Sequence, residues 1–379
     1  MKVAICGYPP LAFQLSEQLK NNGIECTHFI KDFVSDRSEK NFSMPSLTVP
    51  PIFINFFEFR KFIATEKLDG LIIAEEGLFQ FSKELMKVCK FYSIPNVGII
   101  NFWNPGESIY WLDSDKAFIP YMESNLIDSC NLNCKGCTHF ANLFNDNDFY
   151  ALEDFKRDLR RVSETTDVLR LRLMGGEPLL LKNLDQYIKI ARKYLPKTAL
   201  RLVTNGLLIP STPQYILDAL RENKFVVDIS MYKPTLKIMD KIVSILQTNK
   251  IMFQKITGDI ETFDVYLTLR SGHNMSKVLV NCNSKYCRFI RNGKIYKCPL
   301  DALSFKFAER FNVKNFPNSV GVDIFSSNYT ANLEKLDGAV ELCGWCSETF
   351  RKIDWKPENH PKITDWLVNP DEVENLLPK

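Results

Sequence analysis

Strand and helix patterns alternate through the middle of this 379-residue chain, and this alternation limits its fold more than any other feature. Helical periodicity is found over residues 151–164, 183–195, 213–223 and 235–247. Short apolar runs typical of strands occupy residues 168–176, 199–206, 225–232 and 251–257. Helical crossovers of this length join parallel strands with right-handed connections. We therefore predict a parallel α/β sheet over residues 118–275, curled into a full or partial barrel of the TIM type.

The predicted strands end in polar or glycine-rich segments. These segments are MGGEP at 174–178, TNG at 204–206 and SMYKP at 230–234. Active sites of parallel α/β sheets lie at the carboxyl ends of the strands. The sequence therefore predicts a functional site at this edge of the sheet.

A separate strand and helix series precedes the barrel pattern. Strands are expected at 1–6, 24–30, 68–76 and 95–102, with helices at 10–23 and 81–94. This order predicts a small Rossmann-like α/β domain over residues 1–105. Its first turn, Gly7-Tyr8-Pro9-Pro10, lacks the spaced glycines of a dinucleotide site, so a packing or docking role is favoured over a nucleotide or sugar site.

Charge and the N-terminal segment exclude several function classes. The 48 Lys and Arg residues nearly balance the 45 Asp and Glu residues, which gives no reason to expect nucleic acid or a membrane as the main partner. The first apolar run is interrupted by Gly7, Pro9 and Pro10, so it is too short for a signal peptide or a membrane span. We predict a cytoplasmic protein.

Most of the eleven cysteines fall into two clusters. The first is CxxxCxxC at Cys130, Cys134 and Cys137, and the second contains Cys282, Cys287, Cys298, Cys343 and Cys346. Because the chain is long and shows no export signal, metal or iron–sulfur ligation is favoured over disulfides. Cys6, Cys26 and Cys89 lie apart in apolar segments and are expected to act as small buried hydrophobes.

The first cluster resembles the signature of the radical S-adenosylmethionine (SAM) superfamily, in which CxxxCxxC lies on a loop at the mouth of a partial (βα)6 barrel. The resemblance implies that Cys130, Cys134 and Cys137 ligate three irons of a [4Fe–4S] cluster, whose open iron binds SAM. It further implies reductive cleavage of SAM to a 5′-deoxyadenosyl radical, with an external one-electron reductant such as flavodoxin or ferredoxin.

Two strand ends look like further motifs of this family. Gly175-Gly176-Glu177-Pro178 resembles its GGEP motif, in which glycines allow close backbone approach and the carboxylate accepts a hydrogen bond from the SAM amino group. The resemblance implies SAM contacts from Gly175, Gly176, Glu177, Thr204, Asn205, Asp228 and Ser230. The alternative is a structural zinc site of Cys130, Cys134, Cys137 and His139, which would leave these motifs without a purpose.

One position departs from the family pattern. The family usually has an aromatic residue just before the third cysteine, near the adenine of SAM, whereas this chain has Gly136. We expect Phe140 to supply the adenine contact from the other side of the cysteine loop.

The second cluster surrounds a predicted hairpin. Asn292-Gly293 is a strong type I′ turn signal between Cys287 and Cys298, and the CxxC pair at 343–346 follows much later. This order resembles the SPASM and twitch extensions of radical SAM enzymes, which hold auxiliary [4Fe–4S] clusters. We predict one such cluster in a domain spanning residues 276–379, with Cys282 or Cys287 as a spare thiol. A zinc ribbon is the alternative.

These features lead to three function hypotheses. The first is a radical SAM enzyme that oxidises or epimerises a small polar substrate, such as a sugar, a nucleotide-linked sugar or an amino-acid derivative, in glycan or secondary-metabolite biosynthesis. The second is a peptide or protein maturase, and the third is a zinc-bound scaffold. A proton acceptor is expected at His139 or Tyr232, with Lys233 and His273 as further candidates.

Overall fold

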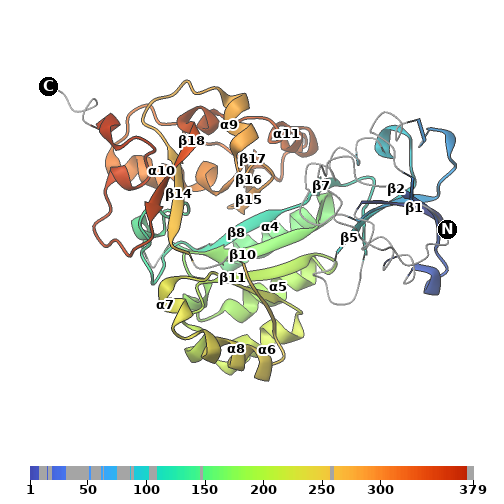
Figure 1. The fold of residues 1–379 in the computed structure, drawn as a ribbon, viewed down its shortest axis with the longest axis horizontal. Coiled ribbons are helices and arrows are strands. Elements are labelled where there is room, and N and C mark those ends of the chain that lie inside the picture. The colour runs from blue at the N-terminus through green and yellow to red at the C-terminus, as the bar shows by residue number, and fades with distance from the viewer. Residues whose placement is uncertain are drawn as a thin grey trace. The chain divides into compact units, whose positions relative to one another are not determined.

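The computed structural model describes residues 1–7, 15, 19–30, 51–52, 61–62, 64–74, 86, 89–101, 109–145, 148–256 and 260–373. The chain divides into two compact units, Met1–Pro120 and Tyr121–Lys379 (Figure 1). Most of the predicted helices at 10–23 and 81–94 lie outside the described residues. Among the described residues, no helix combines the length and apolar character needed to cross a membrane.

The first unit contains a six-stranded sheet. Its strands are β1 (Lys2–Gly7), β2 (Glu25–Ile30), β3 (Pro51–Ile52), β4 (Gly70–Ala74), β5 (Asn96–Ile100) and β6 (Ile109–Trp111), in the order β3-β2-β1-β4-β5-β6. The first five are parallel and β6 is antiparallel to β5. This order, with β1 at the centre, confirms the Rossmann-like α/β prediction. The unit also contains β7 (Ala117–Ile119), so it extends beyond the predicted boundary at residue 105.

The second unit is built on an open eight-stranded sheet. Six parallel strands form most of it: β13 (Met252–Lys255), β12 (Val226–Ile229), β11 (Ala199–Thr204), β10 (Arg170–Gly175), β8 (Met122–Ile127) and β15 (Arg288–Arg291). The antiparallel strands β16 (Lys294–Tyr296) and β17 (Val322–Asp323) extend it. The parallel sheet is the one expected of a partial barrel. Strand β15 lies beyond the predicted barrel boundary at residue 275, yet it pairs directly with β8.

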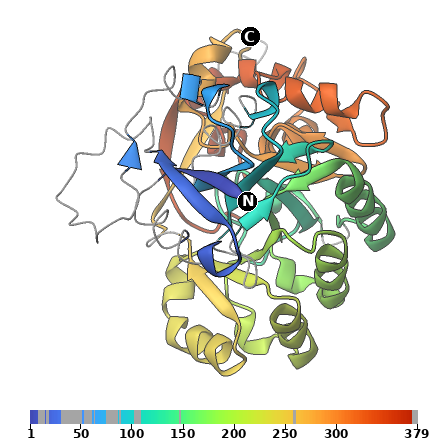
Figure 2. The ribbon, with the colours of Figure 1, turned by 90° about the vertical axis from the view of Figure 1, so that its right-hand side faces the viewer.

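Helices cover the outer face of these strands (Figure 2). They are α4 (Leu152–Thr165), α5 (Leu184–Tyr194), α6 (Gln214–Glu222), α7 (Lys233–Leu236) and α8 (Met239–Thr248), and the short strand β9 (Thr166–Val168) follows α4. Each long helix buries one apolar stripe; in α4 the stripe contains Phe155, Leu159 and Val162. The single helix predicted at 235–247 is instead divided into α7 and α8.

The C-terminal region packs beside the barrel sheet within the same unit. It contains β14 (Thr262–Leu267), α9 (Met275–Asn281), α10 (Pro299–Phe311), α11 (Tyr329–Lys335) and β18 (Cys346–Asp354), with β14 and β18 antiparallel. Short 3-10 turns occur at Ala141–Leu143, Pro178–Leu180, Ile209–Ser211, Glu341–Trp345, Ile363–Asp365 and Pro370–Val373. Asn292 and Gly293 have φ of 49° and 75° between β15 and β16, which confirms the predicted type I′ hairpin.

Candidate active site

The three cysteines of the first cluster, Cys130, Cys134 and Cys137, lie together on the loop after β8. Cys134 is buried with Leu132 and Trp355, and Cys130 and Cys137 pack against this group. Gly136 has φ of 63°, and a Cβ atom there would lie 2.4 Å from Ile353 Cδ1 and 2.7 Å from the Asp365 carbonyl oxygen. The C-terminal region thus fills the space where the sequence pattern would have placed an aromatic side chain.

Each of the three sulfurs is close to an N–H group. The Trp355 indole Nε1 lies 3.1 Å from Cys134 Sγ. The backbone N–H of Leu132 donates a hydrogen bond to the sulfur of Cys130, and the backbone N–H groups of residues 139–141 donate to the sulfur of Cys137. Burial nevertheless raises the pKa of all three thiols, to about 12 for Cys130. Buried thiols with donors aimed at them are suited to become thiolates when a cation binds and neutralises their charge.

The GGEP segment holds the end of β10 against the cysteine loop. A Cβ atom on Gly175 would lie 1.9 Å from the Ile127 carbonyl oxygen, and one on Gly176 would lie 1.9 Å from the Ser129 carbonyl oxygen. The Glu177 N–H donates to that Ser129 oxygen at 3.0 Å. These glycines therefore permit the close approach of two backbone segments, whereas the sequence pattern suggested the approach of a ligand.

The carboxylate of Glu177 is fully buried and already has three donors. Oε1 accepts from the Leu179 N–H at 3.1 Å and from Thr204 Oγ1 at 2.7 Å, and Oε2 accepts from the Asn205 N–H at 2.8 Å. Burial raises the pKa of Glu177 to about 7, although these donors lower it. Glu177 thus ties GGEP to the TNG turn, and the SAM amino group expected from the sequence would be its fourth donor.

The remaining strand-end residues differ in how close they lie to the cysteines. Asn205 Nδ2 donates to Asn131 Oδ1 at 2.7 Å and lies 3.9 Å from Cys130 Sγ. The Ser230 N–H donates to the Thr204 carbonyl oxygen at 3.0 Å. Of these residues, Asn205 is therefore the one placed beside a cysteine sulfur.

Asp228 lies inside the sheet in a charged cluster. Its fully buried carboxylate pairs with Arg201, whose Nε is 2.7 Å from Oδ2, and with Arg172, whose Nε is 3.1 Å from the same oxygen. The carboxylate of Asp228, which we expected to contact SAM, is therefore already paired with two guanidinium groups.

Phe140 lies in the core of the C-terminal region. It is fully buried, and its ring packs against Phe307 and Trp366 with centroids 5.9 and 5.7 Å away. A ring enclosed in this way has no surface to offer to an adenine. The expected role of Phe140 in adenine packing therefore does not match its position.

Tyr232 packs beside the cysteine loop. It belongs to the apolar group around Cys134, and its ring lies 5.4 Å from that of Trp355 at an angle of 33°. Burial, followed by the nearby cysteines and Glu177, raises the pKa of Tyr232 well above its usual value. The hydroxyl therefore stays protonated near neutral pH, which makes Tyr232 a poor proton acceptor.

His139 is oriented by a chain of polar side chains. Asn125 Nδ2 donates to Asp128 Oδ1 at 3.0 Å, which turns Asn125 Oδ1 toward His139 Nδ1 at 2.9 Å. An amide oxygen accepts only, so Nδ1 carries the proton and Nε2 has the lone pair. Burial lowers the pKa of His139, and this keeps the imidazole neutral. Of the other two candidates, Lys233 begins α7, and the His273 N–H donates to the Gly344 carbonyl oxygen at 3.4 Å.

Four of the five later cysteines line one cavity, and they are Cys282, Cys298, Cys343 and Cys346. The same cavity is lined by Thr138 and His139 of the cysteine loop, Glu123 of β8, and Lys297. Cys287 does not line it: this thiol is buried and donates to the Arg288 carbonyl oxygen at 3.5 Å, and the nearby Glu123 carboxylate helps to raise its pKa. Within the described part of the chain, no three His, Cys, Asp or Glu side chains are grouped as one metal ion would require.

Sequence reasoning missed three residues of this region. Glu123 and Asn125 alternate on the strand before the cysteine loop, a period-two signal for side chains on one face. Trp355 follows Cys134 by 221 positions and had no local signal at all.

Residues 124–268 match the family model of the Radical SAM superfamily. Among curated proteins, GTP 3',8-cyclase of Helicobacter pylori (strain HPAG1) is 28% identical over 166 residues, which cover 39% of this chain and 51% of that protein. GTP 3',8-cyclase of Sulfurovum sp. (strain NBC37-1) is 32% identical over 111 residues, covering 28% and 33%. The match therefore spans about half or less of the length of these two relatives.

Two solved structures show a weaker likeness. BtrN in complex with AdoMet and 2-DOIA is 16% identical, with 65% of this chain and 98% of that chain covered and a TM-score of 0.37. Native anSMEcpe with bound AdoMet is 21% identical, with 36% and 43% covered and a TM-score of 0.29. The chain therefore contains a radical SAM domain over residues 124–268, and members of that superfamily use a [4Fe–4S] cluster and SAM.

Proposed function

We propose that this protein is an enzyme that cleaves SAM at a [4Fe–4S] cluster and removes a hydrogen atom from a small polar substrate, with net oxidation or epimerisation. One observation carries the proposal. The cavity lined by Cys282, Cys298, Cys343 and Cys346 also reaches His139 on the cysteine loop and Glu123 on the first barrel strand. A second thiol site thus lies next to the loop of the first.

The donors at the first site suit a thiolate-bound cluster. Cys130, Cys134 and Cys137 supply three thiols, which leaves one iron of a cubane open for SAM. The N–H groups near these sulfurs stabilise the added negative charge of thiolates. We propose these three residues as the cluster ligands.

We propose a second [4Fe–4S] cluster on Cys282, Cys298, Cys343 and Cys346. Four thiols lining one cavity match the usual ligand number of a cubane. Cys287 is then the spare thiol, because it lies outside that cavity and its S–H donates to the Arg288 carbonyl oxygen at 3.5 Å. Zinc on the same four thiols is the competing assignment, and metal analysis distinguishes the two.

Cys130, Cys134 and Cys137 would hold the cluster at which SAM would supply a 5′-deoxyadenosyl radical to take the hydrogen atom. For net oxidation, the substrate would then lose a proton, and the second cluster would accept the remaining electron. The chain must provide the acceptor for that proton. His139 lines the cavity, and its Nε2 carries the lone pair because Asn125 holds Nδ1. We therefore assign the proton-accepting role to His139 rather than to Tyr232.

The substrate class is proposed from two considerations. The curated relatives bear the name of an enzyme acting on GTP, which is a small polar molecule. A peptide maturase is the alternative, and it would ordinarily carry a winged-helix-like leader-binding module. The described strands of the first unit instead form a Rossmann-like sheet. We propose a sugar, nucleotide-linked sugar or amino-acid derivative, in glycan or secondary-metabolite biosynthesis.

The test is anaerobic reconstitution with iron and zinc counts and EPR of the dithionite-reduced protein, with and without SAM. The comparison variant replaces Cys130, Cys134 and Cys137 with Ala. We expect about eight irons in the wild type and about four in the variant, with loss of the SAM-sensitive signal. Zinc at both sites without iron would refute the enzyme proposal, and zinc at the second site alone would remove the electron acceptor.

A further inference from the structure

The indole of Trp355 makes a polar contact with a cysteine of the first site. Its Nε1 lies 3.1 Å from Cys134 Sγ, and the residue is buried. Trp355 directly follows β18, the strand that begins at Cys346 of the second thiol site. A single strand of nine residues therefore separates an auxiliary cysteine from a donor to the first cysteine loop.

The backbone on both sides of Trp355 is fixed. The Trp355 N–H donates to the Glu261 carbonyl oxygen at 2.8 Å, and its ring packs against Tyr232. Beyond it, Pro357 forms a β-bridge with Cys134, and the Lys135 N–H donates to the Lys356 carbonyl oxygen at 2.9 Å. These contacts leave the indole little freedom to turn away from the sulfur.

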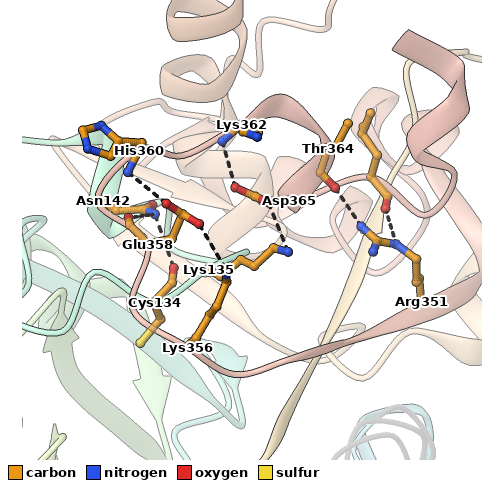
Figure 3. Close-up of polar contacts among 11 residues, drawn as sticks. Cys134, Lys135, Asn142, Arg351, Lys356, Glu358, His360, Lys362, Thr364 and Asp365 are labelled. Atoms are coloured by element: carbon orange, nitrogen blue, oxygen red, sulfur yellow. Dashed lines mark hydrogen bonds and ion pairs between the residues drawn. The ribbon is translucent and has the colours of Figure 1, made fainter. Parts of the chain in front are cut away.

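The segment after Trp355, residues 356–365, continues along the cysteine loop (Figure 3). The Glu358 N–H donates to the Asn133 carbonyl oxygen at 2.7 Å, and Lys135 Nζ pairs with Asp365 Oδ1 at 3.5 Å. Asn142 Nδ2 reaches the Cys134 carbonyl oxygen at 3.4 Å. The C-terminal region thus holds the loop and the indole in one fixed arrangement.

We propose that Trp355 is a positioning residue that sets the reduction potential of the SAM-binding cluster through an N–H···S hydrogen bond to Cys134. This inference rests on the proposed cluster at Cys130, Cys134 and Cys137. Reduction adds one negative charge, shared between the irons and their thiolate ligands, and a donor aimed at a ligand sulfur stabilises the more negative state. Trp355 therefore makes the cluster easier to reduce.

The other sulfurs obtain their donors differently. The sulfurs of Cys130 and Cys137 accept hydrogen bonds from backbone N–H groups of their own loop. A side-chain substitution does not remove these donors. Asn205 Nδ2 lies 3.9 Å from Cys130 Sγ and is a weak donor at best. Among the described side chains of the C-terminal region, Trp355 is thus the one whose hydrogen bond reaches a sulfur of the first site.

The test compares Trp355→Phe with Trp366→Phe in reconstituted protein. Both changes remove a buried indole N–H, but Trp366 Nε1 donates to the Cys137 carbonyl oxygen at 2.8 Å rather than to sulfur. The readout is the midpoint potential of the SAM-sensitive EPR signal in a redox titration. For Trp355→Phe we expect about a tenfold less favourable reduction equilibrium, about 59 mV for a one-electron couple. For Trp366→Phe we expect no such shift.

A measurement on the wild type covers the case in which Trp355→Phe does not fold. Protein containing ¹⁵N-indole tryptophan should show a ¹⁵N coupling to the reduced cluster in pulsed EPR, and Trp366→Phe should retain it. If the wild type showed the SAM-sensitive signal but no ¹⁵N coupling, the role of Trp355 would be refuted and the proposed function would stand. An unshifted potential in folded Trp355→Phe would have the same meaning. A wild type that binds no iron would overturn both this inference and the proposed function.

Discussion

Arg291 forms a bidentate ion pair with Asp128, with Nη1 2.6 Å from Oδ1 and Nη2 2.6 Å from Oδ2. Asp128 is fully buried, and through Asn125 it also orients His139. Arg291→Met would leave this carboxylate buried without its cation. We expect a loss of about 3–5 kcal/mol in the free energy of unfolding, measured by urea denaturation.

The matched control is Lys189→Met on the outer face of α5. Lys189 Nζ lies 2.8 Å from Asp185 Oδ2, but the lysine is 58% exposed. Because water screens such a surface pair, we expect Lys189→Met to change the free energy of unfolding far less than Arg291→Met does. Equal losses in the two variants would show that the pair of Arg291 and Asp128 has no special role in stability.

Gly176→Ala should separate the GGEP segment from the cysteine loop. The added Cβ would lie 1.9 Å from the Ser129 carbonyl oxygen and 2.6 Å from that of Asp128, and backbone atoms cannot move aside as a flexible side chain can. Because this loop leads directly to Cys130, we expect the variant to lose about four of about eight irons together with the SAM-sensitive signal. Iron counts and EPR with and without SAM measure both effects.

Gly338→Ala provides the control for an added methyl group. Its Cβ would have the Lys335 carbonyl oxygen as its nearest neighbour, at an ordinary 3.5 Å. This variant should keep all its iron. If Gly176→Ala also kept its iron and its SAM response, the close contact between GGEP and the loop would not matter for the cluster.

Local patterns predicted the parallel sheet, the cysteine loop and the hairpin at Asn292, because each depends on residues close together in sequence. The contact between Trp355 and Cys134 could not be predicted from local patterns, because 221 positions separate the two residues. Strand β15 was missed as a barrel strand for a similar reason. It follows the end of the regular alternation, and only its pairing with β8 reveals its place.

The burial of Phe140 and the occupied carboxylate of Asp228 also escaped prediction. A motif gives the residue type at a strand end, but it does not say which partners have already engaged that side chain. Phe140 joins an aromatic core built from residues far away in sequence, and Asp228 of β12 pairs with Arg201 of β11 and Arg172 of β10.

The cavity geometry predicts unequal effects for the five later cysteines. If the proposed second cluster is present, Cys282→Ala should remove one of its ligands and reduce the iron content from about eight to about four, with the SAM-sensitive signal retained. Cys287→Ala should keep its iron, because this thiol donates to the Arg288 carbonyl oxygen and lies outside the cavity. Iron loss in Cys287→Ala with retention in Cys282→Ala would reverse the ligand assignment.

The fully buried carboxyl of Glu177 should make stability depend on pH. Burial raises its folded pKa from 4.5 to about 7, so between these values the folded protein keeps a proton that the unfolded chain has released. This group therefore contributes more stability at low pH, and its contribution is lost as the pH rises to about 7, by on the order of 3 kcal/mol. Glu177→Gln cannot titrate, so the free energy of unfolding of the wild type, measured relative to this variant in urea, should fall between about pH 4.5 and pH 7. A difference that stays constant or rises over this range would mean that the three donors to the carboxylate outweigh its burial.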